Sequence, residues 1–136
     1  MKATDLMIGD LVTYTGDDEG PITASIEGIN EDSDFGIEIL GTCERIEDIE
    51  PIPITAEILE TNGWVFCDDC EYVSPFDVGF KTGLRIFGFG EYYDEGRFAV
   101  NIGHEQLRNN LKYVHELQNL IRSLGMSEIA NNFKIV

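Results

Sequence analysis

Basic residues are scarce in this sequence. Its 136 residues include 9 lysines and arginines against 26 aspartates and glutamates, so the formal net charge is −17. A chain of this sign repels the phosphates of nucleic acids and of anionic membranes. We therefore expect no direct binding to either. We expect another protein as the partner, and the charge of the chain favours a basic one.

Cysteines and long hydrophobic runs are also few. The three cysteines, Cys43, Cys67 and Cys70, are an odd number and do not make a disulfide framework. No stretch approaches the roughly 20 apolar residues of a membrane span, and the opening residues lack the apolar run of a signal peptide. These absences predict a cytoplasmic protein with reduced thiols.

Familiar catalytic motifs are missing as well. Gly88-Phe89-Gly90 lacks the lysine and the helix of a phosphate-binding loop, and no Gly-x-Ser-x-Gly elbow occurs. His115-Glu116 lacks the second histidine of a metalloprotease helix, because position 119 is Asn. We therefore expect no catalytic residues, no cofactor and a role other than that of an enzyme.

What the first third of the chain does contain is a set of short strands. Alternating or β-branched apolar residues predict strands near 11–14, 22–26 and 35–40, and residues 45–49 fit either a fourth strand or a short helical turn. The run Ile8-Gly9-Asp10 before Val12 resembles the first strand of SH3-like barrels. Residues 1–52 are thus expected to form a small SH3-like β unit.

The rest of the chain, residues 53–136, predicts an α+β unit. Thr55 is a good N-cap for a short helix that closes at Asn62-Gly63. Strand patterns follow at 64–66, 72–73, 84–89 and 97–102. Apolar residues at helical spacing from Leu107 to Leu124 then predict a longer helix, packed on one face of an antiparallel sheet. Alternatively, a last strand near residues 111–114 leads into a helix from His115.

Two acidic clusters and one aromatic pair are the candidate partner-binding residues. The clusters lack the glycine and the twelfth-position ligand of an EF-hand, so we interpret them as solvated turns and not as calcium sites. The neighbouring tyrosines suit a protein contact, because tyrosine is enriched at interface hot spots. The candidates are Asp17, Asp18, Glu19, Glu31, Asp32, Asp34, Tyr92 and Tyr93.

The Cys67-x-x-Cys70 pair could form one side of a zinc site, with Cys43 as a further ligand. A second pair of this kind is absent. Asp68 and Asp69 lie between the two cysteines, and their charges disfavour the thiolate that redox chemistry needs. We expect ordinary reduced cysteines in a β-turn, with metal binding as the lesser alternative.

Three segments together resemble a family of small uncharacterised bacterial proteins, many of them carried on prophage or other mobile DNA. They are 3–12, 49–63 and the Tyr-Val-His-Glu-Leu-Gln run at 113–118. The resemblance implies a non-catalytic accessory or adaptor protein that binds another protein. An acidic nucleic-acid mimic that inhibits a basic DNA-binding or defence protein is the alternative, and a metal-binding cysteine protein is the third.

Overall fold

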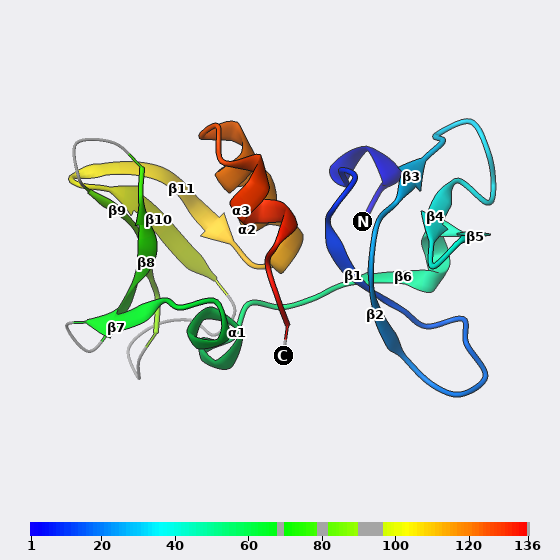
Figure 1. Ribbon diagram of the computed structural model, residues 1–136, viewed down its shortest axis with the longest axis horizontal. Helices are drawn as coiled ribbons and strands as arrows, with labels where there is room; N and C mark the ends of the chain where they lie inside the picture. Colours follow the sequence, from blue (N-terminus) through cyan, green and yellow to red (C-terminus); the bar gives the residue numbers. More distant parts are fainter. Residues whose placement is uncertain (68–69, 79–81, 90–96, 136) are drawn as a thin grey trace. The chain divides into compact units, whose positions relative to one another are not determined.

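The computed structural model describes residues 1–67, 70–78, 82–89 and 97–135 (Figure 1). It is a mixed α+β structure with three small antiparallel sheets, one longer helix near the C-terminus and several short helices, so the predicted class is confirmed. The chain divides into two compact units. The first unit is Met1–Ile52 with Tyr113–Phe133, and the second unit is Pro53–Lys112 with Lys134–Val136.

Two three-stranded sheets build the first unit. In one, β1 is the central strand and pairs antiparallel with β2 and β6; in the other, β4 lies between β3 and β5. Short 3-10 turns, η1 and η2, precede β1 and β6. The bounds are η1 Ala3–Asp5, β1 Leu11–Tyr14, β2 Ile22–Ser25, β3 Gly28–Ile29, β4 Ile37–Ile39, β5 Thr42–Glu44, η2 Ile46–Asp48 and β6 Ile49–Pro51.

Both sheets of the first unit contribute to one apolar core. The inward residues of β1, β2 and β4 are Val12, Ala24, Ile37 and Ile39, and all four are buried in the same cluster. No closed barrel forms among the described residues, because the strands divide into two separate sheets and do not pair in a continuous ring. The short strands near 11, 22 and 37 lie where the alternation predicted them.

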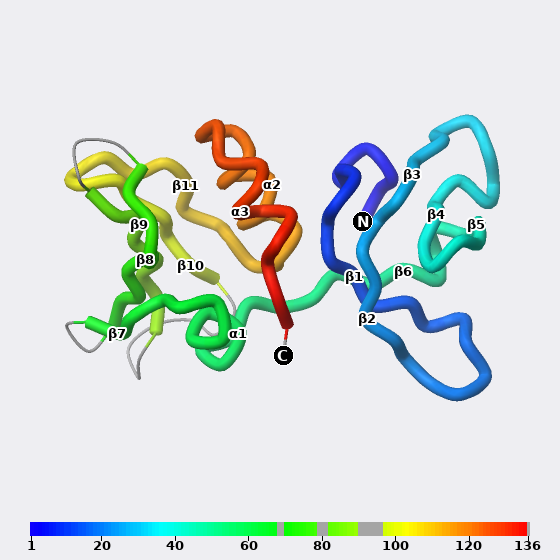
Figure 2. Tube along the Cα trace, in the orientation of Figure 1, coloured from blue at the N-terminus to red at the C-terminus, as the bar shows by residue number. Residues whose placement is uncertain are grey.

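The helices near the C-terminus belong to the first unit. Helix α2 (Val114–Ser123) and the short α3 (Ser127–Asn131) pack on each other, as the trace in Figure 2 shows. The buried Gln118 side chain accepts a hydrogen bond from Leu11 N at 2.8 Å and donates to the carbonyls of Gly9 at 3.1 Å and Ala130 at 2.8 Å. The sequence predicted that this helix packs on the antiparallel sheet of residues 53–136. The helix instead belongs to the first unit and lies beside β1.

A buried ion pair reinforces this attachment. The carboxylate of Asp10, with 0% of its side chain exposed, is paired with the Arg122 guanidinium, whose side chain is 8% exposed. Asp10 also accepts from Met7 N at 2.8 Å and from the Asn119 amide at 3.3 Å. Because a buried charge is tolerated only with such partners, Asp10 fixes which helix face lies against the N-terminal segment.

The predicted helix starts later than its apolar pattern indicated. Leu107 and Leu111 lie in strand β11 (Glu105–Leu111), so the alternative of a last strand before the helix describes this region better. Tyr113 N donates to the Glu116 carboxylate at 3.0 Å, which satisfies a backbone donor at the start of α2. At the other end Gly125, with φ +84°, closes the helix.

A five-stranded antiparallel sheet forms most of the second unit, with the strand order β11-β10-β9-β8-β7. Helix α1 (Ala56–Thr61) precedes it and begins as predicted, because the Thr55 hydroxyl accepts from Ile58 N at 3.2 Å. Gly63, with φ +84°, then redirects the chain into the sheet. The remaining strands are β7 Val65–Cys67, β8 Glu71–Asp77, β9 Gly83–Phe87 and β10 Phe98–Ile102.

Strand β8 is longer than the strand pattern at 72–73 indicated. Strand β8 continues to Asp77, with an irregular register against β9 between Val73 and Asp77. Proline donates no hydrogen bond to the ladder, so a bulge is where a strand accommodates it.

No helix within the described ranges is long and apolar enough to cross a membrane.

We predict that Arg122→Met lowers the free energy of unfolding by about 3–5 kcal/mol, because it leaves the Asp10 carboxylate buried without its cation. Urea denaturation followed by far-UV circular dichroism measures the change. Arg45→Met is the matched control, since Arg45 is an exposed arginine of the same unit, and its loss should stay below about 1 kcal/mol. Equal losses in the two variants would contradict the role given to the ion pair.

Candidate functional site

A pocket of about 380 Å³ opens on the first unit. Its walls come from the end of β1, the loop that follows, the start of β2 and the turn between β4 and β5. Three carboxylates line it, from Asp17, Asp18 and Glu44, beside an apolar surface from Ile22, Ile39 and Leu40. We name this cavity the acidic pocket.

Glu44 is held rigidly in the acidic pocket. The Tyr14 hydroxyl donates to Glu44 Oε2 at 2.8 Å, and the Thr42 hydroxyl donates to Glu44 Oε1 at 2.9 Å. The hydrogen bond to Glu44 raises the pKa of Tyr14 from 10 to about 12, with further contributions from burial and from the charges of Glu44, Asp48 and Asp17. A phenol that resists ionisation in this way reports the negative potential of its surroundings.

The loop between β1 and β2 places the other two carboxylates. Asp17 Oδ1 accepts a hydrogen bond from Glu19 N at 2.8 Å, a local turn that Asp forms readily, and Gly20 follows with φ +114°. Asp17 and Asp18 line the acidic pocket, whereas Glu19 is not among its lining residues. Among the predicted partner-binding residues that the structure describes, Asp17 and Asp18 line this pocket.

The second acidic cluster lies elsewhere on the first unit. Glu31, Asp32 and Asp34 occupy the loop between β3 and β4, at the end of β4 opposite to the turn that lines the acidic pocket. Asp32 N donates to Asn30 Oδ1 at 3.1 Å, so this loop is built from local turns. Tyr92 and Tyr93 lie outside the described residues.

The cysteines are distributed over both units. Cys43 is exposed on β5 of the first unit, while Cys67, at the end of β7, and Cys70, just before β8, are half-buried in the second. Within the part of the chain that the structure describes, no three histidine, cysteine or acidic side chains gather in an arrangement that could hold a metal ion.

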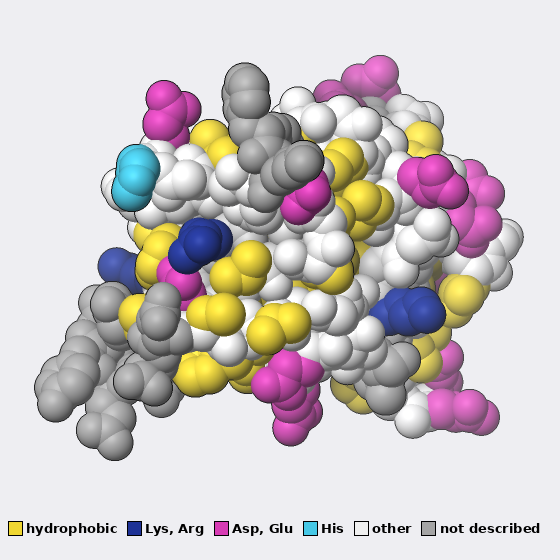
Figure 3. Space-filling model, turned by 60° about the vertical axis from the view of Figure 1, so that its left-hand side comes forward, with side chains coloured by type: hydrophobic (Ala, Val, Ile, Leu, Met, Phe, Trp, Pro, Cys, Tyr) yellow, Lys and Arg dark blue, Asp and Glu magenta, His cyan; other side chains and the backbone are white. Residues whose placement is uncertain are grey.

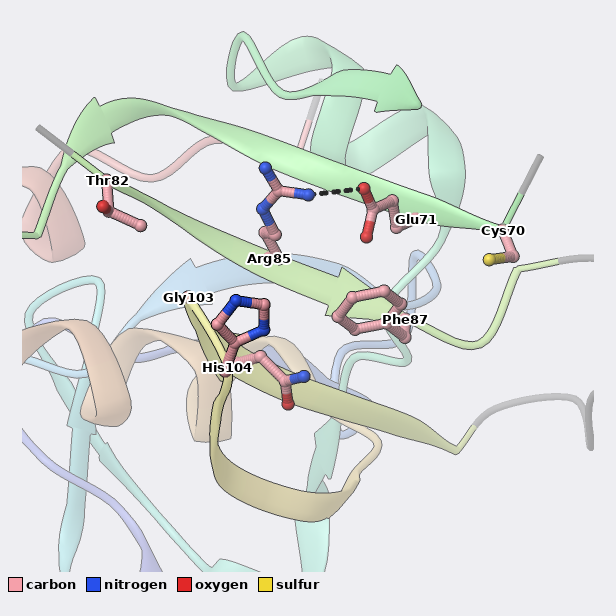
Figure 4. Close-up of a pocket in the computed structure, with 8 residues that line it drawn as sticks. Cys70, Glu71, Thr82, Arg85, Phe87, Gly103 and His104 are labelled. Atoms are coloured by element: carbon pink, nitrogen blue, oxygen red, sulfur yellow. Dashed lines mark hydrogen bonds and ion pairs between the residues drawn. The ribbon is translucent and has the colours of Figure 1, made fainter. Parts of the chain in front are cut away.

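A second cavity, of about 620 Å³, lies on the five-stranded sheet. We name it the sheet pocket; its residues shown in Figure 4 include Glu71, Arg85, Phe87 and His104. The register pairs Glu71 with Phe87, and Arg85 with Asn101, so these side chains share one face of the sheet. Leu84, Ile86 and Val100 alternate with them and are fully buried on the opposite face.

Apart from Cys70, which was considered as a metal ligand, the sequence interpretation did not single out the residues of the sheet pocket. The sequence feature that could have indicated this pocket is a polar residue in each of two otherwise apolar strands, namely Arg85 and Asn101. Alternation alone assigns such residues to a solvated face. It does not indicate that the face is hollowed, because that depends on neighbouring strands and turns.

Comparisons of the chain with protein-family models, with curated proteins and with solved structures found no match.

We predict that Glu44→Gln shifts the pKa of Tyr14 from about 12 back toward 10, because it removes the carboxylate that contributes most to the rise. Tyrosine Cζ chemical shifts followed against pH measure this titration. The pKa of Tyr72, raised to about 12 chiefly by burial and then by its bond to Glu60, should not change and is an internal control.

The sign of the pH effect follows from the same values. The folded protein retains the Tyr14 proton up to about pH 12, whereas the unfolded chain releases it near pH 10. The stabilisation is therefore complete below pH 10 and is lost as the pH rises toward 12. A wild-type Tyr14 titrating near 10 would contradict the arrangement.

Proposed function

We propose that this protein is a non-catalytic accessory or adaptor protein that binds a basic segment of another protein. The acidic pocket is the proposed contact, and it accepts a lysine or arginine side chain of the partner. An origin in mobile DNA belongs to the same proposal and rests on the sequence resemblance.

The single observation that carries this proposal is the composition of the acidic pocket. Lysine and arginine have an apolar stem and a cationic head. The pocket offers an apolar surface from Ile22, Ile39 and Leu40 to the stem, and carboxylates from Asp17 and Asp18 to the head. Its lining residues, all of them in the described part of the chain, include no lysine or arginine that would compete.

The charge of the whole chain supports the same partner chemistry. A net charge of −17 accelerates the approach of a basic protein over distances that salt limits to about 10 Å at 0.1 M ionic strength. The loop with Glu31, Asp32 and Asp34 adds to this field without lining the pocket. The long-range attraction of a basic partner and the local contact at the acidic pocket therefore depend on different residues of the first unit.

The nucleic-acid mimic requires an uninterrupted array of carboxylates in place of phosphates. On the face in Figure 3, the acidic side chains are interspersed with hydrophobic and uncharged ones. The predicted carboxylates of the first unit fall in two separate loops, residues 17–19 and 31–34, which favours discrete recognition of side chains over imitation of a duplex. The mimic nevertheless makes a distinct prediction, namely competition with duplex DNA for a basic DNA-binding protein.

We predict that Asp17→Asn with Asp18→Asn weakens binding of a fluorescent lysine- and arginine-containing peptide about tenfold, because two carboxylates at the pocket lose their charge. Fluorescence anisotropy at 50 and 150 mM salt measures the affinity. Binding should weaken at the higher salt concentration because screening increases.

A charge-matched variant separates the pocket from the general field. Glu31→Gln with Asp32→Asn removes the same charge from the other acidic loop and should weaken binding less than about twofold. Equal losses would assign the affinity to diffuse charge alone. A peptide with glutamine at the basic positions that binds as well as the basic peptide would contradict the proposed function.

A further inference from the structure

The sheet pocket lies in the second unit and is independent of the acidic pocket. Its volume of about 620 Å³ is within the range of small-molecule sites, roughly 300–1,000 Å³. Its polar groups come from strands β8, β9 and β10 and from the turn after β10. Groups on paired strands are held more rigidly than groups on loops, which suits a site that must fix the orientation of a ligand.

Asn101 is the unusual residue of the sheet pocket. Its side-chain oxygen is buried and has no hydrogen-bond partner among the described residues. A buried acceptor of this kind costs about 1–3 kcal/mol, and proteins retain few of them. The amide can turn about χ2, a torsion with a broad profile, and so present its oxygen to a donor in the pocket.

Arg85 supplies the complementary donors. Its Nη1 donates to Glu71 Oε1 at 2.9 Å, while 42% of the arginine side chain stays exposed, compared with 3% of Glu71. In Figure 4 the guanidinium is turned toward Glu71, and His104 lies on the side of Arg85 away from that carboxylate. Guanidinium has five N–H donors, so the bond to Glu71 leaves others for a ligand.

The charges in the sheet pocket favour a neutral ligand. Glu71 compensates the charge of Arg85, and the chain as a whole carries −17, so a phosphate or a polycarboxylate has no net attraction here. Phe87 adds an aromatic ring to the same wall. A flat polar molecule can pack on this ring and on the guanidinium plane while its edge forms hydrogen bonds.

The register of the sheet restricts the pattern of hydrogen bonds further. Arg85 and Asn101 are direct cross-strand partners on one face, with Cβ atoms expected about 4.5–5.5 Å apart. A donor and an acceptor so close together require a ligand whose carbonyl and N–H lie on one edge. A trans peptide bond directs these two groups to opposite sides, whereas a six-membered lactam ring presents them side by side.

From this geometry we propose that the sheet pocket binds a small, neutral, planar ring with a lactam edge, the chemistry of an oxo-substituted nucleobase. Arg85 donates to the ring carbonyl, and Asn101 accepts from the neighbouring ring N–H. Phe87 packs against the ring. This site goes beyond the proposed function, and either one can fail without the other.

Titration of the ¹⁵N-labelled full chain with uracil and with hypoxanthine tests the proposal. Saturable shifts are expected for backbone amides of Glu71, Arg85, Phe87 and Asn101, which lie around the pocket. The ligand 1,3-dimethyluracil retains the ring and the carbonyls but has no N–H. It should bind at least about tenfold more weakly, because Asn101 then gains no donor.

Asn101→Val separates a binding role from a structural one. Binding of uracil should fall at least about tenfold, while the melting temperature of the free protein stays equal or rises, because valine suits a strand and removes an unsatisfied acceptor. Asp18→Asn, in the first unit, should bind uracil like the wild type. No saturable shift with either lactam, equal binding of dimethyluracil, unchanged binding by Asn101→Val or a lower melting temperature for that variant would each overturn the proposal.

Discussion

The carboxylate of Asp10 is the constraint on which the first unit depends. It is fully buried, and its partners are the backbone of its own turn and two side chains of α2, Asn119 and Arg122. A carboxylate in that position without its cation would be far less stable than one in water. The turn before β1 and the face of α2 are therefore specified together, although 112 residues separate Asp10 from Arg122.

Gln118 also attaches α2 to the rest of the first unit, through hydrogen bonds to backbone groups. Its single amide satisfies donors and acceptors from three places in the first unit, at Gly9, Leu11 and Ala130. The second unit has a simpler topology, since every pair of neighbouring strands in its five-stranded sheet is consecutive in the chain. Its polar face carries the buried side-chain oxygen of Asn101, which has no hydrogen-bond partner among the described residues.

Local signals in the sequence predicted local structure well. Thr55 and Gly63 mark the ends of a short helix through capping chemistry that acts within a few residues, and alternation located β1 and the strands around Ile37 and Leu84. Nothing in the sequence near Gln118 indicates that its amide is fully buried and bonded to the N-terminal segment. An amphipathic pattern indicates that a helix buries one face, but not against which sheet, because that choice depends on partners such as Asp10 that are distant in sequence. The candidate sites also differ in how far the sequence predicts them. Asp17 and Asp18 are identifiable from their local acidic cluster. Asn101 is recognisable only from its register against Arg85 on the neighbouring strand.

The discontinuity of the first unit has a consequence for biosynthesis. A chain emerging from the ribosome exposes residues 1–52 long before residues 113–133 that complete their unit. The intervening second unit contains its own sheet and can become ordered in the meantime, as an insertion does within a host domain. During that interval the carboxylate of Asp10 remains hydrated, and the first unit completes its fold only once α2 has been synthesised.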